Sequence, residues 1–431
     1  MLARRDVLRG LGLSILAVGT LGLLDACGDD PRKPNPPGGS TDLTLASSDV
    51  QRSDPDPAAV VDGVGSMHAL GAGLWGQLST GEGNLAISPF SVAVALGMTA
   101  NGAEGTTLDE MLDVLAVESA GAANAGYNAV TQYVESLSGP VAEDQEIVLE
   151  AANALFGQRD TAWEQPFLDA LAASYGAGMQ QVDYKTAAEA ARTAINAWTA
   201  ERTRDKIPEL IPDDVLDDLT RLVLVNALYL KAPWATPFEK DFTADGDFHV
   251  TEDTTVSVPM MRGTEGISGS AGDGWRSARI PYAGAQLAMT LVLPDGDLDA
   301  FVSDGLLAGV LAADLTRSVD LTMPRWTFHT PSPLKDALEA LGMPTAFDEN
   351  AADFSGMTLE EELHIAAVLH EVFIAVDEEG TEAAAATAVV VAGESAAMPG
   401  EPLVLDRPFL FVIHDVEHGT PLFVGRVGDP S

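Results

Sequence analysis

A run of small residues near the C-terminal end is the feature that most restricts what this chain can fold into. Residues 381–391 read TEAAAATAVVV. Alanine favours a helix, whereas the three valines and the flanking Gly380 and Gly393 favour extended chain, so both conformations are open to the segment. In a strand, the residues that share one face would be small enough to fit beneath a layer of helices: Thr381, Ala383, Ala385 and Thr387.

An exposed segment that can form a strand and carries little charge promotes aggregation unless the fold makes use of it. Two hypotheses therefore remain for residues 381–391. The segment is either a plain alanine-rich surface loop or a loop that the protein inserts into one of its own sheets. The second hypothesis requires a sheet that can accept another strand.

The order of the expected elements indicates the fold class. Apolar spacing predicts helices over residues 91–100, 107–117, 166–175 and 187–203. Strand-like runs cover residues 222–230, 286–293, 319–323, 363–376, 409–413 and 422–427. Helices early and strands late, without regular alternation, predict an α+β fold rather than a doubly wound sheet. The length of 431 residues allows either one large body or two to three domains.

The N-terminus has the pattern of an exported lipoprotein. Arg4, Arg5 and Arg9 precede an apolar run over residues 11–24, which ends shortly before Cys27. This resembles a bacterial lipoprotein signal, in which the cysteine is lipidated and becomes the mature N-terminus. The alternative is a retained membrane anchor, although the run is short for a permanent transmembrane helix.

We therefore expect a signal peptide over residues 1–27, a flexible linker over residues 28–60 and a globular domain over residues 61–429. The linker is rich in Pro, Gly, Ser and Asp and has too little apolar content to bury a core. Both forms of the N-terminus predict an extracytoplasmic protein, either lipid-anchored to a bacterial membrane or secreted. Because Cys27 is the only cysteine, no intrachain disulfide or cysteine zinc cluster can form.

The charge balance excludes several classes of partner. The chain has 65 acidic and 23 basic residues, which gives a formal net charge of −42 at pH 7. A surface of this sign repels phosphate backbones and anionic headgroups, so we expect no nucleic-acid binding and no membrane contact apart from the lipid. A solvated acidic coat that keeps the protein soluble accounts for the charge, and we expect a monomer.

No motif supports catalysis by this chain. Residues 71–76 fit G-x-G-x-x-G, but no strand precedes them, as a dinucleotide site would require. Residues 414–418 fit H-x-x-E-H, whose imidazoles must share one helix face to hold zinc, but here they join two strand-like runs and predict a hairpin turn. No G-x-S-x-G nucleophile motif occurs. We therefore expect no enzyme activity, no metal and no cofactor.

The segment over residues 378–391 resembles the hinge and reactive loop of a serpin. Further motifs resemble serpin landmarks in the order of that family: NLAISPFS and GAEGTT at residues 84–91 and 102–107, TRLVLVNALYLKAPW at 220–234, VPMM at 258–261, DRPFLF at 406–411 and PLFVGRV at 421–427. The resemblance implies a serpin domain over residues 61–429, with helices packed on three β-sheets and an exposed reactive loop. One departure is Asp205, where the family commonly has glycine.

The resemblance implies a suicide-substrate inhibitor of extracytoplasmic serine proteases. The protease would attack the reactive loop and form an acyl-enzyme, which is trapped when the cut loop inserts into the central sheet. The spacing usual in the family places the reactive bond between Glu394 and Ser395, which implies a glutamate-specific protease. A shift of the bond to neighbouring alanines would imply an elastase-like enzyme. The alternative function is a non-inhibitory serpin that acts as a binding or chaperone-like protein.

The resemblance also implies roles for individual residues. The hinge comprises Glu378, Gly380, Thr381, Glu382, Ala383, Ala384, Ala385 and Ala386. The shutter, which holds the two middle strands together, comprises Ser88, Ser91, Asn153, Asn226 and His370. The breach, where the hinge meets the sheet, contains Trp234 and Arg325, and Arg325 is expected to pair with Glu378. The small uncharged residues on the inserting face favour the inhibitory function over the alternative.

Overall fold

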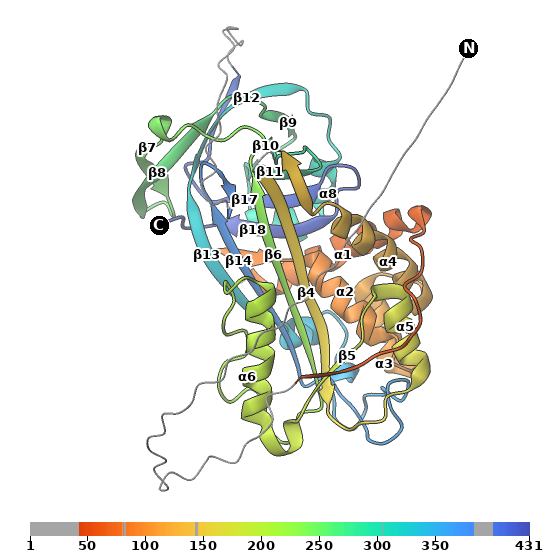
Figure 1. Ribbon diagram of the computed structural model, residues 1–431. Helices are drawn as coiled ribbons and strands as arrows, with labels where there is room; N and C mark the ends of the chain where they lie inside the picture. Colours follow the sequence, from red (N-terminus) through yellow and green to blue (C-terminus); the bar gives the residue numbers. More distant parts are fainter. Residues whose placement is uncertain (1–42, 80, 82, 143–144, 304, 383–399) are drawn as a thin grey trace, which may run out of the picture. The chain divides into compact units, whose positions relative to one another are not determined.

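The computed structural model describes residues 43–79, 81, 83–142, 145–303, 305–382 and 400–431 (Figure 1). The predicted signal peptide and Cys27 lie outside these residues. The described helices are α1 (Val60–Leu78), α2 (Pro89–Ala100), α3 (Gly105–Leu115), α4 (Ala120–Ser136), α5 (Gln165–Tyr175), α6 (Tyr184–Arg202), α7 (Leu298–Ser303), α8 (Leu306–Leu311) and α9 (Lys335–Ala340). None of these described helices is both long enough and apolar enough to cross a bilayer.

One sheet contains the strands that surround the hinge. In the described residues its order is β1-β5-β4-β6-β15-β14-β13, and β3 pairs with β4. These strands are β1 (Thr44–Ala46), β3 (Gly139–Ala142), β4 (Gln145–Gln158), β5 (Met179–Val182), β6 (Leu222–Pro233), β13 (Trp326–Pro333), β14 (Ala367–Val376) and β15 (Gly380–Thr381). We call this the central sheet.

The remaining described strands form a second network, in the order β2-β18-β17-β11-β10-β9-β12-β8-β7 with β16 beside β12. They are β2 (Leu85–Ile87), β7 (Ala244–His249), β8 (Thr255–Gly263), β9 (Ser268–Gly272), β10 (Trp275–Pro281), β11 (Leu287–Pro294), β12 (Arg317–Pro324), β16 (Glu401–Val404), β17 (Phe409–Asp415) and β18 (Pro421–Val427). Only Arg317 and Ser318 of β12 pair with β9. The network therefore consists of two sheets joined at β12. Together with the central sheet they make three sheets in the described part of the chain.

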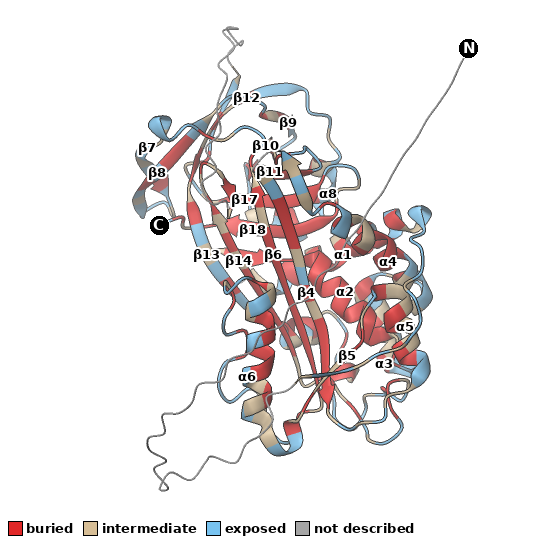
Figure 2. Ribbon diagram, viewed as in Figure 1, coloured by how far each residue is buried: buried red, intermediate tan, exposed pale blue. Residues whose placement is uncertain are grey.

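Helix α2 lies in the interior of the fold. Ser88 caps it by accepting a hydrogen bond from the backbone N–H of Ser91 at 3.2 Å, and Pro89 opens the first turn. Every residue of α2 is buried, as its red colour in Figure 2 shows. A helix that is apolar on all sides must be covered on all sides. It contacts β4 and β6 of the central sheet as well as β18 of the second network.

Helix α6 covers the opposite face of the central sheet (Figure 1). Ile195 and Trp198 of this helix belong to a second apolar cluster with Phe156 of β4 and Val223 of β6. The rings of Phe156 and Trp198 meet edge to face, with centroids 5.3 Å apart. Helix α2 therefore covers one face of the central sheet and α6 covers part of the other, where outer-face residues such as Glu146 of β4 and Thr327 of β13 stay exposed.

The C-terminal part of the predicted flexible linker is docked rather than free. Strand β1 pairs antiparallel with β5. The guanidinium group of Arg52 bonds to the carboxylate of Glu135 at 2.9 Å, to Asn128 at 3.0 Å and to Thr131 at 2.5 Å, all on α4. The prediction of a linker extending to residue 60 was wrong here, because a few polar and main-chain contacts hold a segment with little apolar surface.

The turn after α6 gives a prediction about stability. Asp205 has a left-handed backbone with φ +61°, a conformation that glycine adopts without the steric cost of a Cβ atom. We expect Asp205→Gly to raise the free energy of unfolding by about 0.5–1 kcal/mol in urea titrations. Asp218→Gly is the matched control, because the backbone of Asp218 is not left-handed. An increase for both variants, or for neither, would contradict the explanation by backbone strain.

Candidate functional site

The first residues of the predicted hinge already form part of the central sheet. In β15, Thr381 pairs with Ala232 of β6 on one side and with Val376 of β14 on the other. At the other end of the two strands, residues 223–227 of β6 pair directly, in parallel, with residues 367–371 of β14. The hinge thus occupies one end of the seam between β6 and β14, and direct pairing closes the other end.

Gly380 lies close against the backbone of β6. A Cβ atom at this position would lie 2.2 Å from the carbonyl oxygen of Ala232 and 2.8 Å from the Cα atom of Pro233. Both are backbone atoms, so they cannot rotate away as a side chain can. Any residue with a Cβ atom would therefore clash here, and only glycine fits.

Thr381 points into the interior and is 2% exposed. Its hydroxyl lies 2.6 Å from the hydroxyl of Tyr282. The ring of Tyr282 stacks on Trp234 with centroids 4.6 Å apart, and the indole N–H of Trp234 donates to the carbonyl of Asp377 at 2.9 Å. The aromatic pair therefore forms the surface on which the hinge rests.

The structure brings Glu378 and Arg325 together. The Glu378 side chain is only 2% exposed, and its carboxylate accepts hydrogen bonds from Arg325 Nε at 2.8 Å and from the Thr243 hydroxyl at 2.6 Å. Burial alone would raise the pKa of Glu378, but these two hydrogen bonds outweigh burial and lower its pKa. The carboxylate is therefore charged and paired, and it fixes the start of the hinge against the second network.

The predicted shutter residues also meet, below the hinge. The Ser88 backbone N–H donates to Nε2 of His370 at 3.0 Å, so the imidazole proton lies on Nδ1 and is donated to the Asn226 carbonyl at 3.1 Å. Burial lowers the pKa of His370 to about 4, which keeps the ring neutral. The Ser91 hydroxyl donates to Asn153 Oδ1 at 2.5 Å. Helix α2 is thereby tied to β4, β6 and β14.

The side-chain amide of Asn226 is buried, and neither its oxygen nor its nitrogen has a hydrogen-bond partner in the described structure. Its position is central, because Asn226 lies opposite Asn153 of β4 and opposite His370 of β14. A buried amide without a partner is costly, and in a native protein it calls for an explanation. A partner that arrives with an inserted strand would satisfy it.

Several predicted site residues lie outside the described residues: Ala383, Ala384, Ala385 and Ala386 of the hinge, and Glu394 and Ser395 of the reactive bond. Conversely, no sequence motif pointed to Tyr282 or Thr243 as site residues. These residues are 99 and 135 positions from the hinge residues that they bond. No local pattern connects such distant positions, so only the folded sheets could reveal them.

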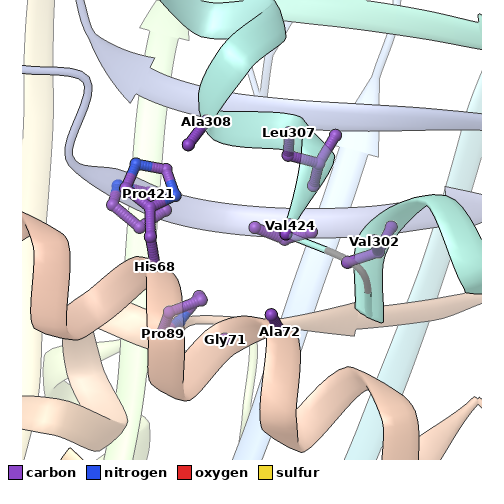
Figure 3. Close-up of a pocket in the computed structure, with 10 residues that line it drawn as sticks. His68, Gly71, Ala72, Pro89, Val302, Leu307, Ala308, Pro421 and Val424 are labelled. Carbon is purple, nitrogen blue, oxygen red and sulfur yellow. The ribbon is translucent and has the colours of Figure 1, made fainter. Parts of the chain in front are cut away.

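A separate hollow lies between α1, α8 and β18, and Gly71, the first glycine of the G-x-G-x-x-G motif, is among the residues that line it (Figure 3). A Cβ atom at Gly71 would lie 2.7 Å from Pro89 of α2, so this glycine permits two helices to pack closely. The main polar group there is His68, whose Nε2 lies 2.9 Å from the carbonyl of Gly419 and whose pKa is lowered by burial. The described residues contain no cluster of three side chains placed to hold a metal ion.

Comparisons with known proteins agree with one another. A family model described as "Serpin (serine protease inhibitor)" matches residues 66–430. An uncharacterized serpin-like protein of Thermococcus kodakarensis is 33% identical over 99% of each chain. The bovine leukocyte elastase inhibitor is 34% identical over 81% of this chain and 93% of its own. The crystal structure of the thermophilic serpin tengpin in its native state covers 89% of this chain and 97% of its own, with a TM-score of 0.76 and 26% identity.

Proposed function

Because the chain belongs to the serpin family, we propose that it inhibits an extracytoplasmic serine protease as a suicide substrate. The observation that carries the proposal is β15, whose two residues already stand as a strand between β6 and β14. A loop that has begun to join the sheet is placed to continue once a protease cuts it. The inhibitor needs no nucleophile of its own, because the serine of the protease forms the acyl-enzyme.

The register of β15 supports the continuation. Thr381 lies opposite Ala232 and Val376, so a strand extended by six residues brings Thr387 opposite Asn226 and His370. Alternation along a strand directs Thr387 to the same inner face as Thr381. The threonine hydroxyl would then reach the buried Asn226 amide that lacks a partner in the native sheet. Insertion would thus give the Asn226 amide a hydrogen-bond partner and also add the missing strand to the central sheet.

The same movement accounts for the trapping of a protease. Each inserted residue gains ladder hydrogen bonds to its neighbours, and every second side chain is buried on the inner face of the sheet, toward α2. The acylated protease is carried along with the strand, and its oxyanion hole is deformed. Loss of a single oxyanion-hole donor slows acyl transfer by about 10²–10³-fold. Deacylation therefore stalls, and the covalent complex persists.

We propose Glu394–Ser395 as the reactive bond and a glutamate-specific endopeptidase as the target. A carboxylate that enters the primary pocket of a protease needs positive charge or hydrogen-bond donors there. The alanines near Glu394 leave an elastase-like target as the alternative. The name of one relative, leukocyte elastase inhibitor, agrees with that alternative.

We also propose that the chain is exported and acts as a monomer, attached to a bacterial membrane through a lipid on Cys27 or secreted. The basic start, the apolar run over residues 11–24 and the single cysteine support this proposal. Mass spectrometry of the N-terminal peptide from the native host would test it. A lipidated peptide that begins at Cys27 is the expected result, and an unprocessed N-terminus starting at Met1 would contradict it.

The test of inhibition mixes the protein with glutamate-specific and elastase-like proteases and examines the products on denaturing gels. We expect a covalent complex that survives hot detergent, together with a released C-terminal peptide starting at Ser395. A protease whose active-site serine has been blocked is the control and should give no complex. Complete loop cleavage without any complex would favour the non-inhibitory alternative. A released peptide starting at Gly393 or Met398 would instead identify an elastase-like target.

A further inference from the structure

The strand formed by the hinge stops at a charged residue. Glu382 follows Thr381 directly, and its backbone N–H still donates to the Ala375 carbonyl of β14 at 2.9 Å, as a continued strand requires. However, its φ is +48°, a left-handed conformation that is strained for any residue with a Cβ atom. This conformation ends the extended geometry, so further insertion requires Glu382 to return to the β region.

One cation holds Glu382 in this arrested position. The carboxylate lies 2.9 Å from Nζ of Lys206, which belongs to the turn after α6, and the two side chains are 15% and 38% exposed. Nζ of Lys206 also lies 5.1 Å from the ring centroid of Phe373 on β14. The pKa of nearby Tyr229 on β6 is raised to about 12 by burial and by the charge of Glu382. The carboxylate therefore rests on the outer face of the central sheet, opposite to the side on which Thr381 is buried.

Lys231 of β6 is a second cation near the hinge, one position before Ala232 in the strand. The register that places Thr381 opposite Ala232 places an extended Glu382 opposite Lys231 of β6. Because side chains alternate, Lys231 and Glu382 would then point to the same outer face. In the native sheet Nζ of Lys231 is 3.6 Å from the carboxylate of Glu146, whose side chain is 55% exposed. Such an open and long contact leaves Lys231 available to a closer partner.

We propose that Glu382 is a two-position latch on loop insertion. Lys206 stabilises the arrested hinge, and Lys231 accepts the same carboxylate across the strands once the hinge extends. The two lysines therefore influence the rate of insertion in opposite directions. Lys206 and Lys231 are positioning residues, since neither one contacts the protease or the bond that it cuts. The latch rests on the proposed function, because it acts only if the loop inserts.

The test compares two matched substitutions, Lys206→Met and Lys231→Met, each of which removes one cation and keeps an unbranched apolar stem. Insertion is followed by stopped-flow tryptophan fluorescence, since Trp234 lies beside the hinge, at protease concentrations where the rate no longer rises. We expect Lys206→Met to speed insertion and Lys231→Met to slow it, each about two- to five-fold, as partly exposed ion pairs allow. In 1 M salt both differences should shrink.

Glu382→Gln supplies the specific control. In that background neither lysine substitution should change the rate, because the shared carboxylate is gone. Equal effects of the two lysine variants, no effect of either, or effects that persist with Glu382→Gln would overturn the latch. The melting temperature of cleaved protein separates this failure from that of the proposed function. A cleaved protein that is no more stable than the intact one does not insert its loop, and both proposals then fail together.

Discussion

Cleavage of the reactive loop should raise the melting temperature of this protein by at least about 10 °C. Residues 383–391 would each add hydrogen bonds to β6 and β14, and a net gain near 1 kcal/mol per residue sums to roughly 10 kcal/mol. For a domain of this size, such a gain corresponds to a shift of about 10–15 °C. Calorimetry of intact protein and of protein cut near Glu394 measures the difference directly.

A sample cut far from the loop serves as the control, because a nick that frees no strand should lower the melting temperature or leave it unchanged. Thr381→Arg, cut at the same bond as the wild type, is a second control, since a strand that cannot enter the sheet gives no stabilisation. Intact and cut wild-type samples that melt together would argue against insertion and for the non-inhibitory alternative.

Much of the fold could be predicted because its signals are local. Apolar spacing identified α2, α3, α5 and α6 to within a few residues. The hairpin expected at residues 414–418 is confirmed, with β17 ending at Asp415 and β18 beginning at Pro421. The family and the serpin fold expected from the motifs are also confirmed.

The elements that were missed owe their conformation to distant partners. Helix α4 packs through Gly126 onto Gly63 of α1, where a Cβ atom would lie about 3.0 Å from backbone atoms, and this close contact depends on a residue 63 positions away in the chain. Strand β4 carries Ala151, Ala152 and Ala154, which favour a helix by propensity. Pairing with β6 along ten positions overrides that preference.

The residues of the candidate site could be predicted from motifs, but their contacts could not, because these contacts also depend on distant partners. The resemblance named Glu378, Gly380 and Thr381 by position, but it did not show that the last two already pair as a strand. Nor did it provide the contact of Lys206 with Glu382, which spans 176 positions and exists only because a turn after α6 reaches the hinge. Motifs identify which residues matter, whereas the partners of these residues follow from the sheet register.

The substitution Thr381→Arg should convert the inhibitor into a substrate. Thr381 is 2% exposed and bonds to Tyr282 beneath the sheet, so a guanidinium there would be buried without a partner. Arginine cannot escape this cost by losing its proton, and an unpaired buried charge costs about 3–5 kcal/mol. At 1.36 kcal/mol per tenfold, insertion should slow by at least about 100-fold. The acyl-enzyme would then hydrolyse first, and gels should show cleaved inhibitor and free protease.

Thr381→Ala separates the effect of charge from the loss of one hydrogen bond. Alanine is small enough for the inner face, so this variant should still form the covalent complex, although its hinge is held less firmly because the Tyr282 contact is absent. The intact Thr381→Arg protein should melt as a folded domain, since its hinge can leave the end of the seam without opening the pairs between β6 and β14. Among the described residues, the inner face of the sheet has no partner for a buried guanidinium group at this position. Undiminished complex formation by folded Thr381→Arg would therefore show that residue 381 does not enter the sheet, and it would rule out insertion at this strand position.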